Sequence, residues 1–124
     1  YDPSLPQMKA DREQLIQVFL NIIGNAIESL GEVGKICLRT RAIRQFTIRG
    51  QRHRLVASIE IIDNGPGISP DMLEKIFYPL ITTKAKGSGL GLSIAQHLIH
   101  SHGGLIECKS RSGETIFTIL LPLY

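Results

Sequence analysis

The most informative stretch of this chain is Lys86-Gly87-Ser88-Gly89-Leu90-Gly91-Leu92-Ser93. Its three alternate glycines allow the backbone to approach a ligand without obstruction by a Cβ atom. Apolar residues over 94–99 recur with helical spacing, so we predict a helix that begins inside the glycine run. The first N–H groups of a helix lack intrahelical partners and carry the positive end of its dipole, which makes the stretch a candidate phosphate-binding loop. The alternative is a plain turn before a helix.

Length and composition indicate one globular domain. The 124 residues are 43% hydrophobic and 20% charged, which is enough apolar material for a single buried core. No apolar run approaches the roughly 20 residues of a membrane span, and no signal peptide opens the chain, so we expect a cytoplasmic protein without membrane contact. Cys37 and Cys108 lack a CxxC spacing, which argues against a zinc site or a disulfide framework.

Hydrophobic periodicity predicts two helices, each followed by a strand hairpin. The first helix runs from Asp11, a candidate N-cap, through Leu30. Alternation over 35–63 predicts an antiparallel pair joined around Gly50, with Leu38 on the same face as Ile36. We further predict a short helix over 70–76, a polar loop over 77–86, the glycine-initiated helix ending at 103–104, and strands over 105–110 and 114–121. This order favours an α/β two-layer sandwich, with helices on one face of a mixed or antiparallel sheet.

Three polar residues of the first helix, Asn21, Asn25 and Glu28, fall on one narrow stripe with Gly24 at its edge. Two Asn and one Gly each cost roughly 0.5 to 1 kcal/mol of helix propensity relative to Ala, so a ligand-binding role would explain their presence. An amide oxygen is a hard ligand suited to Mg²⁺ bound with ATP. A solvated helix face is the alternative interpretation.

Two further polar positions lie on predicted strands. Alternation places Asp63 on the core side with Ile59 and Ile61, where a carboxylate needs a hydrogen-bond donor. An Asx turn with its own backbone would supply one, and a ligand amine such as that of adenine would supply another. Thr115 follows Gly113 on a late strand, where a β-branched residue also serves simply as a strand former.

The order of these pieces resembles the ATP-binding catalytic domain of two-component sensor histidine kinases, a branch of the Bergerat-fold (GHKL) ATPases that include gyrase, Hsp90 and MutL. Residues 21–26 (NIIGNA) resemble the N box, 63–68 (DNGPGI) the G1 box, 77–84 (FYPLITTK) the F box and lid, 87–92 (GSGLGL) the G2 box, and 113–117 (GETIF) the closing Gly-x-Thr-x-Phe. The start of the chain, the arginine-rich hairpin and residues 77–80 are similar to the nitrogen-regulation sensor kinases.

The resemblance implies that ATP and Mg²⁺ bind here. It makes Asn25 the Mg²⁺ ligand, places Asn21 near the phosphates, and makes Asp63 the adenine acceptor with Thr115 assisting. Lys84 is the foremost phosphate-binding lysine. The other implied nucleotide contacts are Gly65, Gly67, Ile68, Lys86, Gly87, Ser88, Gly89, Leu90, Gly91 and Leu92. Glu28 departs from the Lys of many sensor kinases, so Lys84 or Lys86 would have to supply that positive contact.

The same resemblance favours phosphoryl transfer over hydrolysis. The gyrase and Hsp90 branches typically carry a water-activating Glu at the position of Asn21, and an amide cannot take a proton at neutral pH. Transfer to an imidazole mainly needs positioning and charge neutralisation. None of the four histidines lies in a His-Glu/Asp-x-x-Asn/Thr-Pro setting. We therefore expect residues 1–124 to be one domain of a longer sensor kinase, inactive in autophosphorylation without its acceptor-His dimerisation domain.

Other functions stay open on the sequence. A serine kinase of the anti-sigma type shares the N and G boxes. The arginines over 39–54 form a basic stretch, but alternation splits them between faces and Phe46 is the single aromatic among them, which disfavours nucleic acid. The resemblance implies instead the protein's own acceptor domain, a response regulator of the NtrC type and the PII signal protein as partners, with the basic hairpin as a candidate docking surface.

Overall fold

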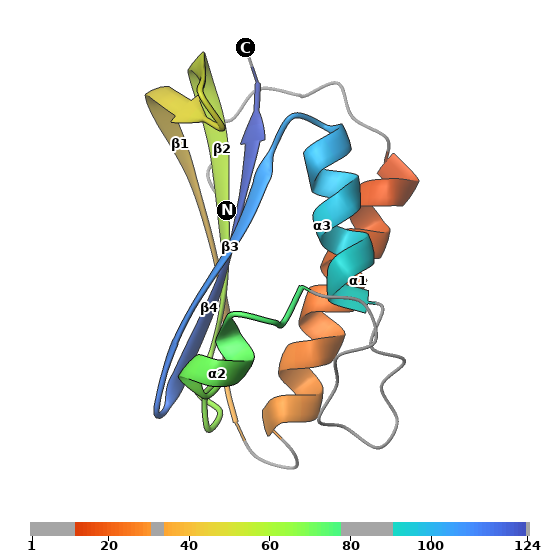
Figure 1. Cartoon of the computed structure of the whole chain (residues 1–124), viewed down its shortest axis with the longest axis vertical. Coiled ribbons are helices and arrows are strands. Elements are labelled where there is room, and N and C mark those ends of the chain that lie inside the picture. Colours follow the sequence, from red (N-terminus) through yellow and green to blue (C-terminus); the bar gives the residue numbers. More distant parts are fainter. Residues whose placement is uncertain (1–11, 31–33, 78–90, 124) are drawn as a thin grey trace.

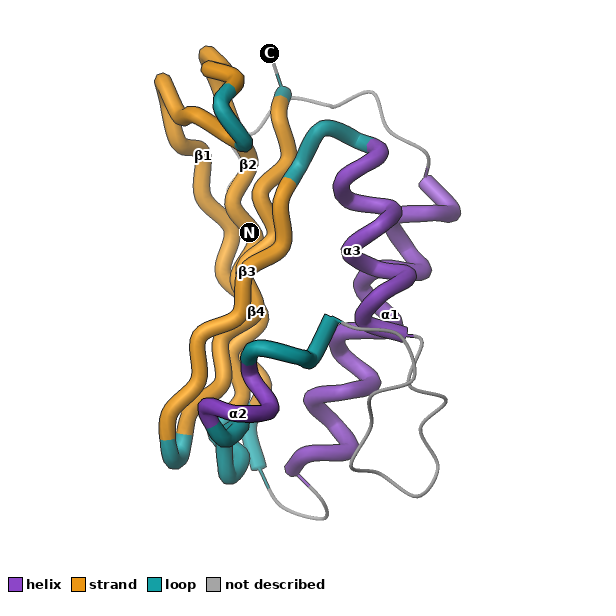
Figure 2. The backbone as a smooth tube through the Cα atoms, viewed as in Figure 1, coloured by secondary structure: helices purple, strands orange, loops and turns teal. Residues whose placement is uncertain are grey.

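The computed structural model describes residues 12–30, 34–77 and 91–123, which fold into two layers. Its elements are α1 (Arg12–Leu30), β1 (Ile36–Ile48), β2 (Gln51–Asp63), α2 (Pro70–Leu73), α3 (Gly91–Ser101), β3 (Leu105–Arg111) and β4 (Glu114–Pro122). The four strands form one antiparallel sheet in the order β1-β2-β4-β3. Helices α1 and α3 lie side by side on one face of the sheet (Figures 1 and 2). The predicted two-layer sandwich is confirmed, with antiparallel pairing throughout the described strands.

The main core lies between the helices and the sheet. Fully buried side chains come from α1 (Val18, Ile22), α3 (Ala95, Ile99), β2 (Ile61) and β4 (Phe117, Ile119, Leu121). The helical residues recur at a spacing of four and the β4 residues at a spacing of two, so each element presents one apolar face. No helix among the described elements is long and apolar enough to span a membrane.

The hairpin of β1 and β2 extends beyond this core. Its turn residues, Arg49 and Gly50, have φ values of 47° and 82°, the left-handed conformation that a two-residue hairpin turn favours. Within β1, Gln45 also has a positive φ, of 53°. Further along the strand, Ile48 packs with Val56 and Leu120 in a second small cluster. Leu120 alternates with the core residues on β4, so this cluster lies on the sheet face away from the helices.

The face predicted for Leu38 is confirmed, and the predicted extent of the short helix needs correction. Leu38 pairs with Ile61 and so shares a face with Ile36, as predicted, and it is 54% exposed because β1 is an edge strand of the described sheet. The short helix predicted over 70–76 is a single turn, capped by the Ser69 hydroxyl, which accepts from the Met72 N–H at 3.3 Å. The Lys75 N–H then donates to the Met72 carbonyl at 2.9 Å, and this tighter three-residue spacing ends the helix.

The other boundaries agree with the sequence. Helix α3 begins at Gly91, within the glycine run, and ends where the Gly104 N–H donates to the Ile99 carbonyl at 2.9 Å. Gly103, just before Gly104, has a left-handed φ of 76°. The predicted N-cap Asp11 and the predicted loop beyond residue 77 lie outside the described residues.

Candidate functional site

Four side chains form a row across one end of the sheet, on the side that faces the helices. The register pairs Ile36 with Asp63, Asp63 with Thr115, and Thr115 with Ser110. Asp63 and Thr115 are buried, with only 3% and 4% of their surface exposed. Paired residues point to the same face of a sheet, so the prediction that Asp63 faces the core is confirmed.

The Asp63 carboxylate stabilises the turn that follows β2. Its Oδ1 accepts a hydrogen bond from the Gly65 N–H at 3.0 Å, which is the Asx-turn arrangement expected of Asp-Asn-Gly. An ionised carboxylate has room for about four hydrogen bonds. The predicted Asx turn is therefore present, and the carboxylate keeps capacity to accept from a ligand as well.

Asn64 ties the same turn to the edge strand, which the sequence did not indicate. Its Oδ1 accepts from the Lys35 N–H at 2.7 Å, while its own N–H donates to the Lys35 carbonyl at 3.2 Å. The side chain of Asn64 thus points to β1, and Asp63 is left as the carboxylate on the helix-facing side.

The next part of the turn packs on the end of β3. Gly67 has a φ of 87°, and a Cβ atom placed on it would lie 2.3 Å from the Arg111 carbonyl oxygen. The Ile68 N–H donates to the Ser110 hydroxyl at 2.7 Å. Protein packing therefore requires glycine at position 67. That Gly65, Gly67 and Ile68 contact a nucleotide stays a prediction.

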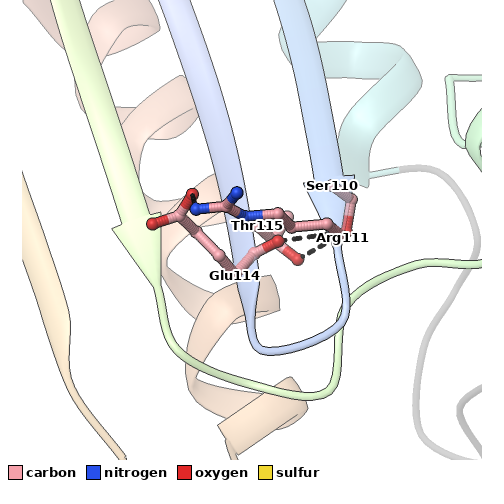
Figure 3. A network of polar contacts seen from close by, with 4 residues as sticks. All are labelled: Ser110, Arg111, Glu114 and Thr115. Atoms are coloured by element: carbon pink, nitrogen blue, oxygen red, sulfur yellow. Dashed lines mark hydrogen bonds and ion pairs between the residues drawn. The ribbon is translucent and has the colours of Figure 1, made fainter.

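Ser110 joins this turn to Thr115 (Figure 3). Its hydroxyl lies 2.9 Å from the Thr115 hydroxyl and 3.4 Å from the Glu114 carbonyl oxygen. An ion pair at 3.3 Å between the exposed side chains of Arg111 and Glu114 lies at the hairpin turn. Sequence reasoning missed Ser110, because a serine just before Arg-Ser-Gly reads as an ordinary turn residue. The signal was its alternation with Cys108 on the inner face.

Asn21 links α1 to the start of α3. Its Nδ2 donates to the Gly91 carbonyl at 3.1 Å, and a Cβ atom on Gly91 would lie 3.7 Å from the Asn21 Cγ. Asn25 is one turn further along the same side of α1 and is partly buried. The Asn21 end of the predicted stripe thus contacts the first turn of α3, whereas Glu28 at its far end is exposed.

The residues next to Asp63 on the inner face of the sheet are apolar. Phe117, buried on β4, is flanked by Ile61 and Cys108 in the register and makes an edge-to-face contact with Phe77 at 6.4 Å between ring centroids. Burial, followed by the negative charge of Asp63, raises the pKa of the Cys108 thiol to about 12. The shift is consistent with the burial of Cys108 among apolar residues close to the carboxylate.

The predicted site residues fall into two groups. Asn21, Asn25, Gly91 and Leu92 come from the two helices, and Asp63, Gly65, Gly67, Ile68 and Thr115 from one end of the sheet. Lys84, Lys86, Gly87, Ser88, Gly89 and Leu90 lie outside the described residues, so their roles stay predictions.

The described residues suit a purine nucleotide and its metal ion. Apolar core residues next to a buried carboxylate and a hydroxyl match a base with a polar edge. Within the described ranges no three His, Cys, Asp or Glu side chains gather as a metal cluster. The sequence predicts the Asn25 amide oxygen as the protein ligand, and Mg²⁺ bound with a nucleotide commonly uses one or two protein ligands, with water and phosphate oxygens completing its shell.

The family of histidine kinase-, DNA gyrase B- and HSP90-like ATPases matches residues 10–124. The chain belongs to this ATPase family. Among its relatives in the family, the sensory histidine kinase/phosphatase NtrB of Salmonella typhimurium is 51% identical over 124 residues, which cover 99% of this chain and 36% of the relative. NtrB of Escherichia coli O157:H7 is 50% identical with the same coverage. The chain therefore spans about a third of the length of these relatives.

Solved structures of the ATPase family agree. The nucleotide-free catalytic domain of histidine kinase ThkA has a TM-score of 0.78 and 35% identity, over 94% of this chain and 70% of that one. ThkA in complex with the response regulator TrrA has a TM-score of 0.76 and 31% identity, over 99% of this chain and 32% of that one. The chain thus corresponds to the catalytic domain of a histidine kinase.

Proposed function

We propose that this chain binds MgATP and donates its γ-phosphoryl group to a histidine on a separate acceptor domain. The observation that carries the proposal is the Asp63 carboxylate, 3% exposed beside apolar core residues, with acceptor capacity beyond its bond to Gly65. The exocyclic amino group of adenine is a donor of the kind that such a carboxylate needs. Thr115, paired with Asp63 in the sheet, adds a hydroxyl at the same edge of the base.

The phosphates belong at the start of α3. The Asn21 side chain holds the Gly91 carbonyl, which fixes the first turn of α3 against α1. The first N–H groups of a helix have no intrahelical acceptor and lie at the positive end of its dipole, so the start of α3 favours negative charge. Asn25, on the same side of α1, is the proposed Mg²⁺ ligand, and the metal ion would neutralise charge on the phosphate oxygens.

The Asn21 amide supports phosphoryl transfer over hydrolysis. Its Nδ2 donates to a backbone carbonyl, and an amide has no basic site with which to activate water at neutral pH. The chain thus positions the donor, and the nucleophile comes from elsewhere. This division suits a catalytic domain whose acceptor lies on another domain.

The proposed setting is a cytoplasmic two-component system for nitrogen regulation. It is supported by the identity to NtrB relatives over nearly the whole chain. The acceptor-His dimerisation domain would receive the phosphoryl group, and a response regulator of the NtrC type would take it on, in keeping with the ThkA–TrrA complex. The proposed site for the PII signal protein is the basic hairpin, where Arg41, Arg44 and Arg54 are exposed.

Titration calorimetry of the chain with MgATP tests the nucleotide site. Asp63→Asn keeps the side-chain oxygen that accepts from Gly65 but removes the charge, so we expect ATP affinity to fall at least about tenfold, since hydrogen bonds to charged groups are worth about 1.5 to 3 kcal/mol. The matched control is Asp71→Asn, a change at the exposed carboxylate of α2, which should leave affinity unchanged. Equal affinity in all three proteins would overturn the assignment.

The metal ligand needs its own comparison. Asn25→Ala should weaken ATP binding in Mg²⁺ and have little effect when the metal is chelated. Gln17→Ala, at an exposed position of α1, is the control. An equal loss with and without Mg²⁺ would assign Asn25 to the nucleotide or to the fold instead of the metal.

A further inference from the structure

The Ser110 hydroxyl occupies the centre of the polar row and has a limited set of hydrogen bonds to make. A serine hydroxyl has one hydrogen and two lone pairs. One lone pair accepts from the Ile68 N–H at 2.7 Å. The hydrogen has two acceptors in reach, the Thr115 hydroxyl at 2.9 Å and the Glu114 carbonyl oxygen at 3.4 Å.

Two arrangements of the hydroxyl hydrogens are possible: Ser110 donates to Thr115, or Thr115 donates to Ser110 while Ser110 donates to the Glu114 carbonyl. A hydroxyl donor bonds best at about 2.7 to 2.8 Å, so the Thr115 oxygen is the favoured partner and the Glu114 carbonyl is at the limit. When Ser110 donates its hydrogen to the Thr115 oxygen, the Thr115 hydroxyl does not donate its own hydrogen to Ser110. Thr115 is then left as a hydrogen-bond donor toward the ligand.

We propose that Ser110 is a positioning residue for base recognition, which it performs by setting Thr115 as a donor beside the acceptor Asp63. This inference rests on the proposed nucleotide site. An acceptor next to a donor complements an amino group next to a bare ring nitrogen, which is the polar edge of adenine. Guanine presents a carbonyl next to a ring N–H, which is the opposite pattern. Its carbonyl acceptor would face the Asp63 acceptor, and its N–H donor would face the Thr115 donor.

Ser110 also couples this polarity to the turn after β2. The Ile68 N–H that fills one of its lone pairs belongs to the same turn whose Gly65 N–H bonds Asp63. Gly67 packs directly on the Arg111 carbonyl between these two contacts. The Ser110 hydroxyl therefore both holds the turn in place and orients the Thr115 hydroxyl.

Calorimetry with two nucleotides separates this role from a structural one. The probes are ATP and 1-deaza-ATP, in which a C–H replaces the ring nitrogen next to the amino group. We expect Ser110→Ala to weaken ATP about fivefold and to change 1-deaza-ATP less than twofold. In a Thr115→Val background, where the donor is already gone, adding Ser110→Ala should change ATP affinity less than twofold. Ser112→Ala, in the exposed turn, is the control and should match the wild type.

Three results would overturn the inference. Ser110→Ala would weaken both nucleotides equally, or leave ATP affinity unchanged, or retain its full effect in the Thr115→Val background. Unfolding midpoints of all variants identify any loss that comes from the fold itself. If the wild-type chain fails to bind ATP, the proposed function falls and this inference with it. Wild-type binding with an unaffected Ser110→Ala variant overturns the inference alone.

Discussion

The two cysteines occupy opposite environments, which predicts a difference in reactivity. Cys37 is exposed on β1, whereas Cys108 lies on the inner face with its pKa raised to about 12 by burial and by the charge of Asp63. Because the thiolate is the reactive form, iodoacetamide at about pH 8 should modify Cys37 and leave Cys108 untouched. Intact mass and peptide mapping would show one adduct, and two after denaturation. Comparable rates at both sites in the folded chain would contradict the buried inner-face position.

His100 predicts a pH dependence of stability. Its Nε2 is buried without a hydrogen-bond partner in the structure described, and burial, then Arg49 and His97, lower its pKa below 6.5. The folded state therefore binds fewer protons at this site than the unfolded state, and the free energy of unfolding falls as the pH drops below 6.5 toward the folded pKa. As the pH is lowered from about 8 to 5, the thermal unfolding midpoint of His100→Gln should fall less steeply than that of the wild type. Parallel curves would show that His100 contributes nothing to the dependence.

Single residues differ in how far the sequence reveals them. Strand alternation alone was sufficient to orient Asp63, because a period of two leaves one choice of face. Ser110 was missed because its partners, Ile68 and Thr115, depend on the pairing of β3 with β4 and on the path of a turn 42 positions earlier. Neither is a local property of the sequence around a serine.

At the level of elements, two glycines predict opposite responses to alanine. Gly67 has a left-handed φ of 87° and no room for a Cβ, whereas Gly24 lies within α1 with nothing within 4 Å of the added atom. Gly67→Ala should lower the free energy of unfolding by roughly 1 to 3 kcal/mol or more. Gly24→Ala should raise it by roughly 0.5 to 1 kcal/mol, since glycine weakens a helix interior. Urea unfolding would measure both, and equal stabilities would show that the turn tolerates a side chain.

The type of an element was predictable where its hydrophobic pattern extended over many residues. The length of an element was predictable where glycines marked its end. Helix α3 and both hairpins follow from their patterns. Helix α2 proved shorter than predicted because the hydrogen bond from Lys75 to Met72 tightens the chain, which the composition of residues 70–76 does not reveal. Leu38 is exposed because β1 is an edge strand, and an alternating pattern does not distinguish edge from centre.

The strand order belongs to the whole molecule. Two hairpins could be predicted, but not that β2 pairs with β4 to give β1-β2-β4-β3. That pairing is the one that brings Asp63 and Thr115, 52 positions apart, into a single row. Packing between distant segments determines this strand pairing. The family resemblance therefore predicted which residues share the site, whereas the local sequence pattern predicted only which face of the sheet each residue occupies.

The chain spans about a third of its NtrB relatives, which leads to the last prediction. With γ-labelled ATP and Mg²⁺ the chain alone should acquire no label, because the proposed acceptor histidine lies on another domain. Adding an acceptor-His domain from such a relative should transfer label to that domain alone, and Asp63→Asn should reduce the transfer at limiting ATP while Asp71→Asn does not. Label on the chain itself would contradict the division into donor and acceptor. Rapid phosphate release without transfer would instead indicate hydrolysis and refute the role argued for the Asn21 amide.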